Sequence, residues 1–77
     1  MIVADASVAI KWVLEEKGSK AARALVHADR IVAPSLIMLE CANALWSKVR
    51  SQLSRSAATL GLAKIANAPM RLRTETD

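Results

Sequence analysis

Two short apolar runs, each followed by a longer segment of helical character, constrain the fold of this chain most strongly. Met1 to Ala4 precedes DASVAIKWVLEE, and Ile31 to Ala33 is closed by Pro34 and precedes SLIMLECANALW. Short apolar runs that are bounded by turn residues are typical of buried strands. Strands that alternate with helices favour an α/β fold built on a parallel sheet.

The segments between and after these strands are predicted to be helical. Apolar residues recur at helical spacing, and the pattern predicts helices over Ala6–Glu16, Lys20–His27, Leu36 to about Arg50, and from the residue after Ser54 to about Asn67. Ser19, Ser35 and Ser54 precede the last three helices and are expected to cap them. After Pro69, Met70–Arg73 is a candidate third strand, and Thr74–Asp77 resembles a polar tail.

Composition restricts the class of protein. A chain of 77 residues forms one small domain, and a hydrophobic fraction of 53% excludes disorder over most of its length. The single cysteine, Cys41, excludes an internal disulfide framework, fits a reducing cytosol and is expected to be a buried apolar residue. With no signal peptide and no apolar run near the roughly 20 residues that span a bilayer, we expect a soluble cytoplasmic protein without membrane partners.

The distribution of charge is uneven. The net charge is +4, and the segment from Cys41 to Arg73 holds six basic residues and no acid. This asymmetry suits a polyanionic partner, with nucleic acid as the first candidate. The alternative is a solvated basic surface without a ligand. Trp12 and Trp46 are expected to anchor the core rather than to stack on bases, and His27 is assigned no catalytic role.

Two carboxylates are candidates for a functional site. Asp5 stands at a strand-to-helix junction, where α/β sheets hold ligands, although Asp is also a favoured helix cap. Glu40 and Asn43 lie three residues apart, on one face of a helix that is otherwise apolar over its first three turns. Such a helix is expected to be mostly buried, so that Glu40 would need a partner or a cation.

If the first two strands are parallel neighbours, both carboxylates lie at the same edge of the sheet. Together with Ser7 and Asn43, they offer oxygen ligands and polar donors that suit Mg²⁺ or Mn²⁺ rather than zinc. The alternative is a cap at Asp5 and an ion pair between Glu40 and Arg30 or a lysine.

The segments MIVADASVAIKWVLEE and DRIVAPSLIMLECANALW resemble the beginning of PIN-domain proteins, specifically the VapC toxins of bacterial type II toxin–antitoxin pairs. The acid and hydroxyl of the first family motif are matched by Asp5 and Ser7. The acid and asparagine of the second are matched by Glu40 and Asn43. The resemblance covers residues 1 to about 50 and continues weakly through the predicted fourth helix.

The resemblance implies a three-layer α/β/α fold and a metal-dependent ribonuclease. Asp5 and Glu40 would bind Mg²⁺ or Mn²⁺, while Ser7 and Asn43 would orient the ligands. The basic residues that follow, Lys48, Arg50 and Arg55, would hold the RNA backbone. Family members act on tRNA or other structured RNA, form homodimers and are silenced by a cognate antitoxin.

One departure from the family leads to a second hypothesis. PIN domains complete their site with further acids from a later helix and loop, whereas the only acids after Glu40 are Glu75 and Asp77, which do not match that motif. We therefore expect residues 1–77 to be a single PIN-like domain that is incomplete at its C-terminus. The alternative function is that of a catalytically inactive, truncated PIN fragment that only binds an antitoxin or RNA.

Overall fold

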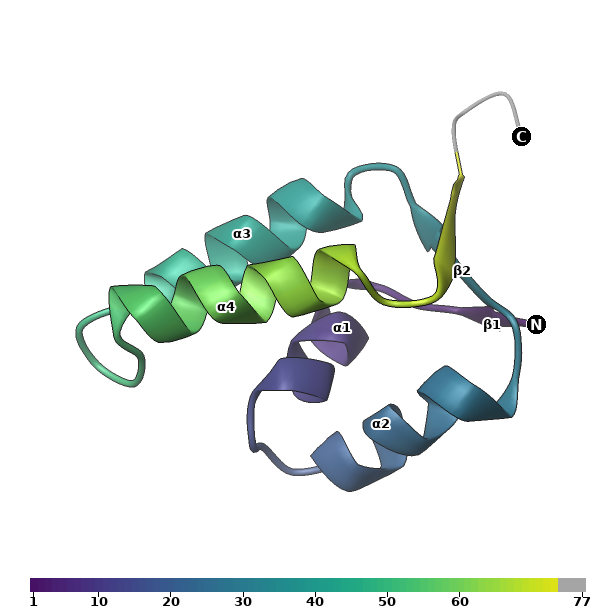
Figure 1. The fold of residues 1–77 in the computed structure, drawn as a ribbon, viewed down its shortest axis with the longest axis horizontal. Coiled ribbons are helices and arrows are strands. Elements are labelled where there is room, and N and C mark those ends of the chain that lie inside the picture. Colours follow the sequence, from purple (N-terminus) through teal and green to yellow (C-terminus); the bar gives the residue numbers. More distant parts are fainter. Residues whose placement is uncertain (74–77) are drawn as a thin grey trace.

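The computed structural model describes residues 1–73, and the predicted polar tail lies outside them. The described residues form a mixed α/β structure of three strands and four helices (Figure 1). In chain order, the elements are β1 (Ile2–Val3), α1 (Ala6–Val13), α2 (Ser19–Ala28), β2 (Ile31–Pro34), α3 (Ile37–Ser47), α4 (Arg55–Ala66) and β3 (Met70–Arg73). Every predicted strand and helix is therefore present, in the predicted order.

The strands form one parallel sheet in the order β1-β2-β3. Ile2 pairs with Ile31 and Val3 with Val32, while Ile31 is paired on its other side with Met70. All three strands run in the same direction, so their carboxyl ends meet at one edge of the sheet. The predicted parallel α/β fold is confirmed.

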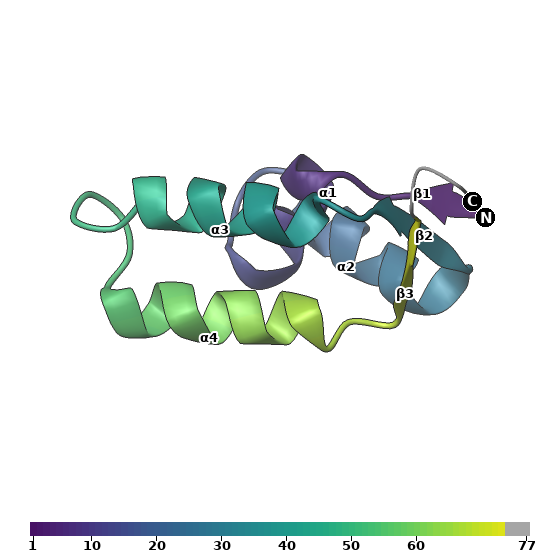
Figure 2. The ribbon, with the colours of Figure 1, turned by 90° about the horizontal axis from the view of Figure 1, so that it is seen from above.

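The hydrophobic core lies between one face of the sheet and the helices. Ala4, Ile31 and Ala33 belong to the same buried cluster as Ile37 and Leu45 of α3. In both views the strands gather at one end of the molecule, and α3 and α4 run side by side away from them (Figures 1 and 2).

The opposite face of the sheet is more open. Val3 alternates with the buried Ala4 and has 58% of its surface exposed. Val32, on the same face, is itself buried, and it borders a hollow that is also lined by Met1, Arg71 and Arg73. Within residues 1–73 the core joins the helices to one face of the sheet, so the third layer of the predicted α/β/α arrangement stays a prediction.

The turn between α1 and α2 differs from the prediction. Helix α1 ends at Val13, three residues earlier than expected, and the cap of α2 is Gly18 rather than Ser19. Gly18 has a φ of 87°, a conformation that glycine adopts without strain. The buried Ser19 hydroxyl donates to the Leu14 carbonyl at 2.6 Å and accepts from the Glu16 N–H at 2.8 Å. Ser19 therefore closes the turn instead of capping the helix.

Of the other two predicted caps, one is wrong and one is confirmed. Helix α3 begins after Leu36, with no side-chain cap from Ser35. It also ends at Ser47, because the carbonyl of Lys48 accepts from the N–H groups of Gln52 and Leu53 and so closes a loop. Ser54 caps α4 as predicted, since its hydroxyl accepts from the Ala57 N–H at 3.1 Å.

None of the helices within residues 1–73 combines the length and apolarity that crossing a membrane requires.

The core assignment predicts different effects for two leucine substitutions. Leu45 of α3 is 1% exposed, whereas Leu60 of α4 is 56% exposed. We expect Leu45→Ala to lower the free energy of unfolding by about 2–5 kcal/mol, because it leaves a cavity in the core. Leu60→Ala is the matched control and should change the free energy by less than about 0.5 kcal/mol. Urea denaturation measures both, and equal effects would contradict the assignment.

Candidate functional site

Asp5 is positioned by the end of β1 and the beginning of α1. It is the N-cap of α1, where its Oδ1 accepts from the Val8 N–H at 3.0 Å and from the Ser7 hydroxyl at 2.7 Å. The cap interpretation is therefore confirmed. Both bonds use Oδ1, and the residues described here provide no hydrogen bond to Oδ2, so capping leaves one oxygen of this exposed carboxylate available to a ligand.

The same contacts keep Asp5 ionised. The hydrogen bond from the Ser7 hydroxyl, followed by that from the Val8 N–H, lowers the pKa of Asp5 below its ordinary value. Hydrogen bonds to a carboxylate favour the charged form. Asp5 therefore keeps its negative charge to a lower pH than an ordinary aspartate does.

Glu40 lies in the first turn of α3, shortly after the carboxyl end of β2. The expectation that it would be buried is wrong, because its side chain is exposed. The same side of α3 also exposes Leu36 and Leu39, by 63% and 58% respectively, since no described element covers it. Among residues 1–73 no ion pair involves Glu40, so the proposed alternative pair with Arg30 does not form in the structure.

Cys41 connects the two carboxylates electrostatically. Its thiol is fully buried, as predicted for an apolar residue of the core. Burial, followed by the negative charges of Glu40 and Asp5, raises the pKa of this thiol to about 11. The negative charges of both carboxylates therefore reach the same buried thiol.

The donor set at this edge suits a hard cation. Asp5 and Glu40 supply carboxylate oxygens, and the exposed Asn43 follows Glu40 by three residues along α3. Within residues 1–73 there is no group of three or more Asp, Glu, His or Cys side chains that could hold a metal. Mg²⁺ is commonly bound through one or two carboxylates while it keeps several waters. The two carboxylates fit that mode of binding.

The basic residues predicted to contact RNA lie at the other end of α3. Lys48 is the C-cap of α3, Arg50 belongs to the following loop, and Arg55 begins α4. The Lys48 ammonium is 3.8 Å from a carboxylate oxygen of Glu16. Arg50 and Arg55 are exposed.

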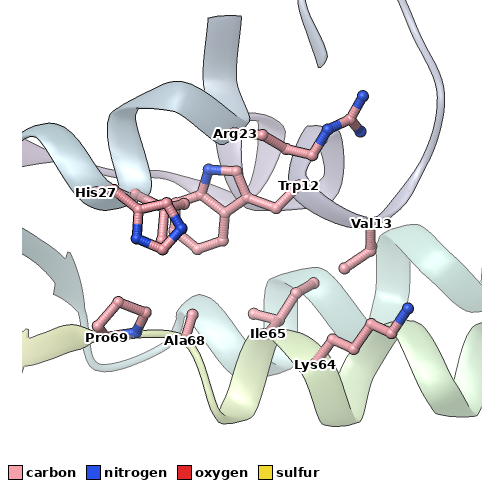
Figure 3. A pocket seen from close by; sticks show the side chains of 9 residues that line it. Trp12, Val13, Arg23, His27, Lys64, Ile65, Ala68 and Pro69 are labelled. Atoms are coloured by element: carbon pink, nitrogen blue, oxygen red, sulfur yellow. The ribbon is translucent and has the colours of Figure 1, made fainter. Parts of the chain in front are cut away.

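Sequence reasoning did not find a cleft between α1, α2 and the end of α4. This pocket of about 250 Å³ has apolar walls that include Trp12 and Ile65, and it does not include either candidate carboxylate (Figure 3). Its polar lining is basic, from Arg23, His27 and Lys64. No sequence motif joins these residues, because Arg23 and His27 lie on α2 and Lys64 lies on α4, and only the fold brings the two helices together.

Residues 2–74 match the model of the PIN-domain family. No curated protein and no solved structure shows significant similarity to the chain.

The two roles of Asp5 can be separated by two substitutions. Asp5→Ala removes both the cap and the charge, and should lower the free energy of unfolding by about 1 kcal/mol. Asp5→Asn removes the charge but keeps a good capping side chain, so we expect nearly wild-type stability. Both variants should lose Mn²⁺ affinity, measured by calorimetric titration. Retention of Mn²⁺ affinity in Asp5→Asn would contradict the assignment of this carboxylate.

The Ser7 hydroxyl should control the ionisation of Asp5. Ser7→Ala removes the largest cause of the lowered pKa, so the pKa of Asp5 should rise toward its ordinary value. Since the folded-state pKa is lowered, the stabilisation is present above the ordinary pKa and is lost as the pH falls through the folded value. NMR titration of the Asp5 carboxyl carbon measures this change, with Ser7→Thr as the control. An unchanged pKa in Ser7→Ala would disprove the role.

Proposed function

This chain belongs to the PIN-domain family, and from that premise we propose that it is a metal-dependent ribonuclease, the VapC-like endoribonuclease toxin of a type II toxin–antitoxin system. Proteins of this family are generally nucleases, which supports the broader statement that the chain belongs to a nuclease family. The observation that supports the finer proposal is the position of two carboxylates after neighbouring parallel strands: Asp5 caps α1 after β1, and Glu40 lies in the first turn of α3 after β2.

In the proposed mechanism, Asp5 and Glu40 would hold Mg²⁺ or Mn²⁺ at the carboxyl edge of the sheet. When bound, the cation supplies an activated water for attack on an RNA phosphodiester and offsets the charge that develops on the phosphate. Ser7 keeps Asp5 ionised and fixes its orientation through the hydrogen bond of 2.7 Å. Asn43 offers an amide, on the same side of α3 as Glu40, to orient the ligands or the phosphate.

The remaining partners of the proposed toxin follow from its surfaces. The exposed Arg50 and Arg55, with Lys48 nearby, would hold tRNA or another structured RNA by its backbone, without reading its sequence. Leu36 and Leu39 expose apolar surface beside Glu40. Such surface would suit a cognate antitoxin or a second copy of the chain in a homodimer. We place these encounters in the cytoplasm, where the single cysteine stays reduced.

One observation favours a second function. No group of three or more Asp, Glu, His or Cys side chains that could hold a metal occurs among the described residues. A PIN protein without catalytic activity that binds an antitoxin or RNA would need neither more acids nor a cation. Metal-dependent cleavage distinguishes the two functions.

The test is cleavage of a mixed tRNA pool by the purified chain with Mn²⁺. We expect cleavage that EDTA abolishes and that Asp5→Asn and Glu40→Gln each reduce by about 100-fold or more, because each variant removes a cation ligand. Asp29→Asn is the matched control, since Asp29 precedes β2 at the amino-end edge and bonds the N-terminal ammonium. Its activity should be that of the wild type.

Two outcomes would contradict the ribonuclease proposal. Cleavage that persists in EDTA and in both carboxylate variants would show that another group, or a contaminant, carries the activity. A folded preparation that binds RNA but does not cleave it would support the second function.

A further inference from the structure

Trp46 does not anchor the core, contrary to the sequence-based expectation. It lies in the last turn of α3 with 46% of its surface exposed. The other tryptophan, Trp12, is only partly exposed, and its indole N–H donates to the Ala22 carbonyl at 3.1 Å. An exposed tryptophan is costly to leave in water, and it commonly marks a binding surface.

The exposed indole borders a hollow with a basic lining. The hollow has a volume of about 370 Å³ and is lined by Trp46, Val49, Arg50 and Arg55. An aromatic face beside arginine side chains is the combination that binds unpaired nucleotides, because the base stacks on the ring and the phosphate pairs with guanidinium. The hollow therefore combines both kinds of contact in one place.

The loop after α3 builds this hollow at an energetic cost. Arg50 has a φ of 89°, in the left-handed region that residues with a side chain rarely adopt. Its N–H donates to the Leu53 carbonyl at 3.2 Å, and Val49 and Leu53 form a bridge. Strained backbone of this kind concentrates at functional sites. Here it holds Arg50 beside Trp46.

The charge of the hollow is not neutralised within the described residues. Lys48 is paired with Glu16, but none of the ion pairs of residues 1–73 involves Arg50 or Arg55. The sequence contains no acid between Cys41 and Arg73. Two arginines that lack an acidic partner are suited to phosphate.

We propose that Trp46, Arg50 and Arg55 form a subsite that binds one unpaired nucleotide of an RNA strand. The base stacks on the indole of Trp46, and the guanidinium groups contact the adjoining phosphates. A base within a duplex hides both of its faces, so the subsite selects single-stranded segments such as loops.

Trp46 of this subsite lies on the same helix as Glu40 of the proposed catalytic site. Trp46 follows Glu40 by six residues, which corresponds to roughly 9 Å along the helix axis, and the exposed Asn43 lies between them. An RNA strand held at Trp46 can therefore extend along α3 toward Glu40 and Asp5. This part of the inference rests on the proposed ribonuclease function. The subsite would hold a nucleotide that neighbours the cleaved bond, whereas the cleaved bond itself would lie at Asp5 and Glu40.

Binding in EDTA tests the subsite without cleavage. The probe is a fluorescein-labelled, unstructured RNA hexanucleotide, and its fluorescence anisotropy reports affinity. Trp46→Leu keeps an apolar helix-forming side chain but removes the aromatic face, and should weaken binding by about 5- to 150-fold, as the loss of one base–aromatic stack does. Trp46→Phe retains a smaller ring and should bind with intermediate affinity. Leu60→Ala, an exposed apolar substitution on α4, is the control and should bind normally.

Salt dependence tests the two arginines. Arg50→Ala and Arg55→Ala should each reduce the slope of log affinity against log salt by about 0.7, the contribution of one phosphate contact on a single strand. Lys20→Ala removes an exposed charge on α2 and should leave the slope unchanged. A duplex of the same sequence should bind the wild type and Trp46→Leu equally.

Three results would overturn the proposal: wild-type affinity in Trp46→Leu, an equal loss in Trp46→Leu and Trp46→Phe, or an equal loss of duplex and single-strand binding. The last two would instead indicate a general surface, such as one that packs against a protein. Failure of the subsite is distinguishable from failure of the ribonuclease function. If RNA binds through Trp46 but is not cleaved in Mn²⁺, only the ribonuclease function is disproved. If cleavage depends on Mn²⁺ but Trp46→Leu binds RNA as tightly as the wild type, only the subsite is disproved.

Discussion

The parallel pairing of β1 with β2 is the constraint on which the candidate site depends. The Ala4 N–H donates to the Val32 carbonyl at 2.8 Å, which continues the pairing to the end of β1. Asp5 follows immediately, and α3 begins shortly after β2 ends at Pro34. Since Ala4 and Ala33 are both fully buried, small side chains at this edge let the helices pack closely on the sheet. If the pairing of β1 with β2 shifted by one residue, the buried side chains of β1 would turn to the opposite face of the sheet, and Asp5 would move relative to Glu40.

The two interpretations of Asp5 are compatible because they use different oxygens. The cap and the Ser7 hydroxyl both occupy Oδ1, and each favours the ionised form of the carboxylate. The cap that stabilises α1 thus also favours the charged form of the Asp5 carboxylate, which is the form that would bind a cation. Glu40 has no comparable support within residues 1–73, since it is exposed and forms no ion pair there. In the proposed cation site, Asp5 would therefore be the fixed ligand and Glu40 the adaptable one.

Much of the fold could be predicted from the sequence because it follows from local patterns. The short apolar runs identified β1 and β2, and Cys41 was correctly predicted to be buried. That Asp5 and Glu40 act together at one edge of this sheet stays a prediction. These predictions needed only the periodicity of apolar residues and the geometry of parallel strands.

The failures concern features that depend on neighbouring elements. The apolar segment around Glu40 indicated a buried helix, yet periodicity shows which side chains are apolar and not whether another element covers them. Glu40 and Trp46 are exposed because no other element within residues 1–73 packs over them. Ser19 and Ser35 had the right residue type and position for caps. Backbone geometry decided otherwise, because Gly18 with its positive φ occupies one cap position and Leu36 the other.

Paramagnetic broadening with Mn²⁺ can test whether Asp5 and Glu40 together hold a divalent cation. Amide signals of the isotope-labelled chain would be followed by NMR at substoichiometric Mn²⁺. If the two carboxylates bind the cation, the signals of Ser7, Val8 and Cys41 should broaden first, and this selectivity should disappear in Asp5→Asn. Broadening that begins at Glu15 and Glu16, or that is unchanged in Asp5→Asn, would contradict it.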